Sequence, residues 1–133
     1  MRSIDVKAIL IAIGATLSLD LLMTVVLTSA VLSPQAALDL QTSQVDALLA
    51  DRTFLIWSLI LGTFSTIVGG FLAARFARGL PYYHSLIYGI FGLVFSALTS
   101  EGLPRWYTAV GFTVLLPAAL LGGHLAKRGT HGR

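Results

Sequence analysis

A single carboxylate lies within an otherwise apolar run. Asp20 falls near the middle of residues 6–33, a segment long enough to cross a bilayer. A charge at that depth costs at least about 2.5 to 3.5 kcal/mol on insertion scales, so an acid there is expected to be neutral or to have a role. Thr16 and Thr24 lie one helical turn to either side of it and offer hydroxyls on the same face. These three residues are the predicted intramembrane polar site, a possible proton or ion site.

Three interpretations of Asp20 remain open from the sequence. A neutral carboxyl can join two helices by hydrogen bonds, which is a structural role. An ionisable carboxyl can relay a proton or a cation, and a carboxyl on the outer face of the helix can contact a partner subunit. Whether Asp20 is neutral or ionisable separates the first interpretation from the second.

Other residue types exclude several classes of chemistry. The chain has no cysteine, so disulfides and thiolate metal sites are absent. The glycine pairs at 69–70 and 122–123 lie inside apolar runs and follow no strand, so we expect no nucleotide. The three histidines all lie on the predicted cytoplasmic side, away from Asp20 near the middle of its span, so no Ser-His-Asp site is expected. The sequence therefore predicts no enzyme and no metal site.

His84 and His124 are the only residues that raise the question of a cofactor. Both lie near the same predicted membrane boundary, on spans that run antiparallel. Such a pair can ligate a b-type haem. Histidines at headgroup level are more often simple polar residues, so we expect no cofactor.

Composition indicates that lipid is part of the solvent of this chain. Of its 133 residues, 56% are hydrophobic and 11% are charged, which is more apolar surface than a soluble domain of this size can bury. The apolar runs lie at about 6–33, 54–74, 85–100 and 106–126. The predicted fold is all-α: one domain, residues 1–133, forming an integral membrane four-helix transmembrane bundle.

The loop at 34–53 is predicted to carry a short periplasmic helix at the membrane interface. Ser33 and Pro34 supply a helix start, and apolar residues then recur at near-helical spacing against acidic ones. Ser43 with Asp46 resembles a capping box. A helix is therefore expected to begin at Ser43 and to run into the second span.

Small residues recur at helical spacing in the second and third spans. In lipid, such residues let helices approach closely. The predicted packing positions are Ser58, Gly62, Ser65 and Gly69, followed by Ser85, Gly89, Gly92 and Ser96. In the fourth span, Pro117 removes a backbone donor, which predicts a kink.

Positive charges predict the orientation. Seven of the nine basic residues flank one set of span ends, and a cytoplasmic excess of such residues fixes topology. The seven are Arg2, Lys7, Arg75, Arg78, Lys127, Arg128 and Arg133, against Arg52 and Arg105. The sequence therefore predicts a multi-pass protein of the bacterial inner (cytoplasmic) membrane with both termini cytoplasmic. Because these residues flank apolar runs and form no basic patch, we expect no nucleic-acid partner.

Residues 69–92, GGFLAARFARGLPYYHSLIYGIFG, resemble a segment of small, uncharacterised four-span bacterial inner-membrane proteins. The resemblance implies a bacterial source and a cytoplasmic loop at 75–84, and it implies no activity. The chain matches no characterised family.

The expected function is that of an accessory or interaction subunit in a membrane assembly. Its expected partners are the lipid bilayer and a protein, either another chain or a second copy. The alternative is a small proton-coupled transporter or ion channel that uses Asp20.

Overall fold

The computed structural model describes residues 5–31, 42–77 and 80–130. These ranges contain helices and no strand: α1 (Val6–Val31), α3 (Thr42–Ala50), α4 (Arg52–Phe76), α5 (Pro81–Thr99) and α6 (Arg105–Thr130). By length and composition, α1, α4, α5 and α6 can each cross a membrane. At about 1.5 Å per residue, the 26 residues of α1 extend about 39 Å, against a hydrocarbon core of about 30 Å. The expected all-α fold with four long apolar helices is confirmed.

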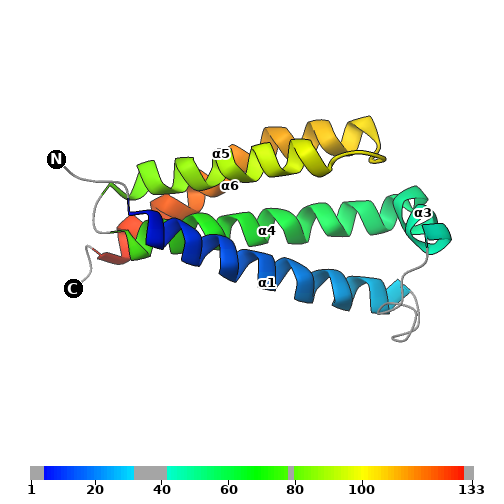
Figure 1. The fold of residues 1–133 in the computed structure, drawn as a ribbon, viewed down its shortest axis with the longest axis horizontal. Helices are drawn as coiled ribbons and strands as arrows, with labels where there is room; N and C mark the ends of the chain where they lie inside the picture. Colours follow the sequence, from blue (N-terminus) through cyan, green and yellow to red (C-terminus); the bar gives the residue numbers. More distant parts are fainter. Residues whose placement is uncertain (1–4, 32–41, 78–79, 131–133) are drawn as a thin grey trace.

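The four long helices run alternately up and down along one axis (Figure 1). The start of α1 and the end of α6 lie at one end of the bundle, which we call the terminal end. The turn between α5 and α6 lies at the other end, with α3 across the start of α4, and we call this the α3 end. Among the described residues α4 contacts every other helix, whereas α1 and α6 do not pack on each other.

A break at Asp51 separates α3 from α4. The Asp51 backbone is extended, with φ −78° and ψ 109°, and its carboxylate accepts hydrogen bonds from the amides of Thr53 at 2.8 Å and Phe54 at 3.3 Å. An acidic N-cap satisfies amides that have no partner within the helix. The expected continuous helix from Ser43 into the second span is therefore wrong, because α4 has its own cap.

The helices extend beyond three of the predicted spans. α5 starts at Pro81 rather than at residue 85, because proline at the first helical position already has the helical φ. α4 covers 52–76 instead of 54–74, and α6 covers 105–130 instead of 106–126. Apolar runs mark the part of a helix that suits lipid, and the helix continues into flanking charged residues. α1 ends at Val31, and residues 32–41, which include the predicted helix start at Ser33, lie outside the described residues.

The half of the bundle at the terminal end is packed through small residues. Ala12, Ala73 and Ala119 are fully buried and enclose the ring of Tyr88. A side chain added at Gly70 would collide with the carbonyl of Ala119. The backbones of α4 and α6 thus touch, which only glycine permits.

The α3 end of the bundle is organised differently. Gly102, in the turn between α5 and α6, has a φ of +83° and therefore needs the conformational freedom of glycine. From that turn α6 runs through Pro117 as one unbroken helix. The kink predicted at this proline stays a prediction.

Candidate functional site

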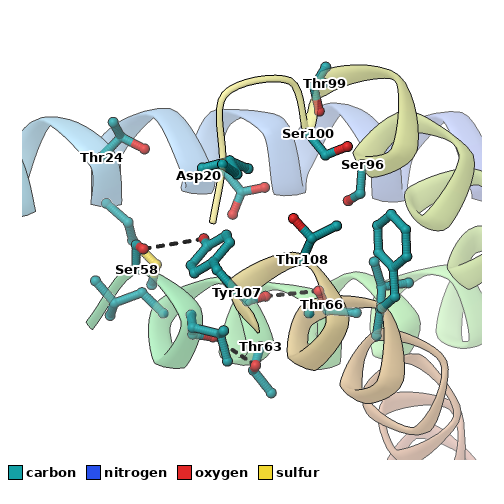
Figure 2. A pocket seen from close by; sticks show the side chains of 18 of the residues that line it. Asp20, Thr24, Ser58, Thr63, Thr66, Ser96, Thr99, Ser100, Tyr107 and Thr108 are labelled. Carbon is teal, nitrogen blue, oxygen red and sulfur yellow. Dashed lines mark hydrogen bonds between the residues drawn. The ribbon is translucent and has the colours of Figure 1, made fainter. Parts of the chain in front are cut away.

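A pocket of about 370 Å³ lies between α1, α4, α5 and α6 in the half of the bundle at the α3 end. This volume is within the range of about 300 to 1,000 Å³ that small-molecule sites occupy. Among the described residues, Asp20 is the only charged one in its lining. Figure 2 shows the Asp20 carboxylate pointing into the space that the labelled hydroxyl side chains surround. The structure thus places the predicted polar residue at a cavity.

In the part of the chain that the structure describes, nine hydroxyl side chains line the pocket together with Asp20. Six of them donate to the backbone of their own helix or of the turn before it. Their oxygens lie 2.7 to 3.4 Å from carbonyls three or four residues earlier in the chain. The six are Ser58, Thr63, Thr66, Thr99, Ser100 and Thr108. A hydroxyl has one proton, so these oxygens can offer a ligand only their lone pairs.

The remaining three hydroxyls belong to Tyr107, Thr24 and Ser96. Tyr107 lies 3.2 Å from Ser58, and because Ser58 already donates to the carbonyl of Leu55, Tyr107 is the donor of this pair. Thr24 and Ser96 make no hydrogen bond within the described parts of the chain. The pocket is therefore lined mainly by hydrogen-bond acceptors.

Behind Asp20, the structure brings together polar side chains from three helices. Thr16, which was expected to offer its hydroxyl to Asp20, donates instead to the carbonyl of Ala12 at 2.7 Å and accepts a hydrogen bond from Tyr88 at 3.1 Å. Tyr88 and Ser65 both lie near the Asp20 carboxyl. Ser65 is 1% exposed, and its hydroxyl makes no hydrogen bond of acceptable geometry with the described residues. A buried hydroxyl without a partner is uncommon and marks this position as unusual.

The predicted small-residue faces divide between the two halves of the bundle. Gly69 and Gly89 are buried in the half at the terminal end, where Gly89 lies against Ala119 and Leu116 of α6. Ser65 and Ser85 are buried as well.

Toward the α3 end, the same faces open onto the pocket, which is lined by Ser58, Gly62 and Ser96. A side chain added at Gly62 would meet nothing within 4 Å, which differs from the predicted close packing. A Cβ added at Gly92 would lie at an ordinary contact distance of 3.5 Å from the side chain of Leu115. The spacing of small residues identifies a face, but the distance to the next helix decides whether that face packs.

The two histidines do not form a shared site. Both ring nitrogens of His84 are engaged: Nε2 accepts from the amide of Asp5 at 2.9 Å, and Nδ1 lies 3.0 Å from the carbonyl of Leu80. His124 is exposed and pairs with the hydroxyl of Tyr82 at 2.8 Å. His84 therefore has no free nitrogen for a haem iron. Within the described residues, no group of three or more His, Cys, Asp or Glu side chains gathers to hold a metal ion.

Comparisons of the chain with protein-family models, curated proteins and solved structures find no match. Its function is therefore inferred from the pocket. The resemblance of residues 69–92 to small bacterial membrane proteins stays a prediction.

Sequence reasoning singled out Asp20 but missed most of the pocket lining. Thr63, Thr66 and Tyr107 were not among the predicted site residues, nor were the three hydroxyls around the turn between α5 and α6. One available signal was the gathering of Ser and Thr in the halves of the spans nearer the predicted periplasmic side. That signal gives depth in the membrane but not the side of the helix that faces a cavity.

Proposed function

We propose that this chain is a multi-pass protein of a bacterial inner membrane, crossed by α1, α4, α5 and α6, with the terminal end cytoplasmic and the α3 end periplasmic. Large apolar side chains cover the outside of the bundle: Leu98 is 78% exposed, Leu21 68% and Leu22 62%. Exposure on this scale is unfavourable in water and favourable in lipid. The orientation is supported by an excess of described basic residues at the terminal end: Lys7, Arg75, Lys127 and Arg128, against Arg52 and Arg105 at the α3 end.

Within that membrane, we propose that the protein is a small transporter whose charged binding residue is Asp20. The observation that carries the proposal is the direction of the Asp20 carboxylate, which faces a pocket between all four long helices. An ionisable residue at membrane depth that faces a cavity is typical of substrate and proton pathways. Asp20 can exchange a proton for a solute, which would couple transport to protons.

The packing of the bundle favours a transporter over a channel. The pocket extends to residues at the α3 end, such as Ser100 and Leu103. In the other half of the bundle, α4 and α6 touch through Gly70 and Gly122. This arrangement matches a carrier that exposes its site to one side at a time, as membrane transporters do when they alternate between two states.

The experiment that tests this proposal is proton-coupled uptake in liposomes, measured with a pH-sensitive dye inside the vesicles. Asp20→Asn should abolish proton movement that depends on added solute. Glu101→Gln is the matched control, because it removes a negative charge from the exposed turn between α5 and α6, outside the pocket lining. Equal flux by the wild type and Asp20→Asn would refute the proposal.

The expectation of an accessory subunit stays a prediction, since no described feature indicates a particular partner. Purification from the native membrane in mild detergent separates the two functions. A protein that co-purifies in fixed stoichiometry would favour the subunit.

A further inference from the structure

We propose that the ligand of the Asp20 pocket is a small organic ammonium ion that carries one positive charge and N–H donors, that is, a protonated primary or secondary amine. This inference rests on the proposed function of the pocket as a solute site. It specifies the chemical class of that solute from the charge, the hydrogen-bonding groups and the size of the lining.

The charge of the lining selects a monocation. Asp20 supplies one negative charge, and no described Lys, Arg or His side chain lines the pocket. The guanidinium of Arg52, near the α3 end, lies over the ring of Trp106 at 6.0 Å, and neither residue lines the pocket. An anionic ligand would therefore face Asp20 without a compensating cation, whereas a cation would neutralise it.

The hydrogen-bonding groups of the lining favour a ligand that donates hydrogen bonds. Seven of the nine hydroxyl protons are already used, six in bonds to backbone carbonyls and that of Tyr107 in its bond to Ser58. Oxygens such as those of Thr63 and Thr66 can then only accept. A polyol or an amide would bring acceptors of its own, which would stay unpaired at a cost. The N–H groups of an ammonium bring donors and no acceptor.

The size and the apolar part of the lining select an organic ion. A volume of about 370 Å³ far exceeds what one bare inorganic cation fills, since a water molecule occupies about 30 Å³. Phe54, Phe112, Leu27 and Leu115 supply apolar surface to the same pocket. Aromatic rings pack against hydrocarbon and also attract ammonium groups to their faces. The expected ligand therefore combines an ammonium head with an apolar body of modest size.

The inference is tested by isothermal titration of the purified protein in nanodiscs with a matched series of probes. Benzylammonium carries the charge and the donors. Benzyltrimethylammonium keeps the charge without N–H groups, benzyl alcohol keeps the shape without the charge, and benzoate reverses the charge. We expect benzylammonium to bind, benzyltrimethylammonium to bind about tenfold more weakly or worse, and the other two not to bind.

Variants separate binding in the pocket from partition into lipid. Asp20→Asn should abolish the benzylammonium signal, and Glu101→Gln should retain it. Thr66→Val, which removes one acceptor while keeping the shape, should weaken benzylammonium binding about threefold to tenfold. This second variant keeps the inference testable if Asp20→Asn lowers the melting temperature.

Several results would overturn the inference. If benzyltrimethylammonium binds as tightly as benzylammonium or more tightly, the pocket does not select N–H donors. If benzyl alcohol binds as tightly as benzylammonium, the pocket does not select a positive charge. Binding of sodium ions that depends on Asp20, without binding of any amine, would identify an inorganic site. Amine binding at Asp20 without flux would leave the ligand class standing and defeat transport. Flux that depends on Asp20 in a protein that binds no amine would support transport and refute the amine as the ligand.

Discussion

The Tyr88 hydroxyl donates to Thr16 Oγ1 at 3.1 Å, and the two side chains meet directly above the backbone of Gly69. This hydrogen bond joins α5 to α1 across α4. Thr16 lies one helical turn before Asp20, so the contact closes the bundle just behind the pocket. The absence of a side chain at position 69 makes the contact possible.

Gly69→Ala should therefore destabilise the bundle. The added methyl group would collide with the ring and hydroxyl of Tyr88 and would lie 2.7 Å from the Thr16 methyl. Overpacking of this kind typically costs about 1 to 3 kcal/mol. Gly14→Ala is the matched control, because a side chain there would meet nothing within 4 Å. Thermal unfolding in detergent measures both, and equal melting temperatures would contradict the described packing.

His84→Ala should lower stability more than His124→Ala. His84 is 2% exposed and joins the amide of Asp5, at the start of α1, to the carbonyl of Leu80, so its removal breaks two hydrogen bonds and leaves a cavity. Each lost hydrogen bond is worth about 0.5 to 1.5 kcal/mol before the cavity is counted. His124 is exposed, so its loss should cost less. If both variants have the same melting temperature as the wild type in thermal unfolding, His84 does not stabilise the terminal end.

The proposed orientation predicts which ends of the helices are accessible from outside the cell. The chain has no cysteine of its own, so each introduced thiol is unique. Ala47→Cys in α3 should react with an impermeant thiol reagent in intact cells. Gly129→Cys, in the last turn of α6, should react only after the cells are opened. The opposite pattern would reverse the topology.

The sequence predicts the long helices well, because an apolar run of sufficient length has few alternatives in lipid. It also predicts Asp20 as a special position, because a carboxylate inside such a run is costly wherever its side chain points. Both inferences depend on one segment at a time. They require no knowledge of how the helices pack.

The rest of the site depends on relations between helices. Thr16 lies on the same helical ladder as Asp20, and only the rotation of α1 against α5 shows that its partner is Tyr88. Gly62 and Gly69 have the same residue type and lie on the same face. Gly62 borders the pocket, whereas Gly69 packs against Tyr88, because the neighbouring helix is close to Gly69 and distant from Gly62. Helix ends are missed for another reason: the cap at Asp51 is set by its carboxylate and not by apolarity.

The most direct test of the account is whether a solute protects a thiol placed in the pocket. Ser96→Cys puts a thiol of similar size into the lining, and Ala97→Cys, the next residue of α5, is exposed and lies outside the lining. In intact cells, a small impermeant thiol reagent should label Ser96→Cys and leave Ala97→Cys unlabelled in lipid. Benzylammonium should slow the labelling of Ser96→Cys, and Asp20→Asn should remove that protection. Labelling of Ser96→Cys no faster than of Ala97→Cys, or protection that persists in Asp20→Asn, would contradict a solute site at Asp20.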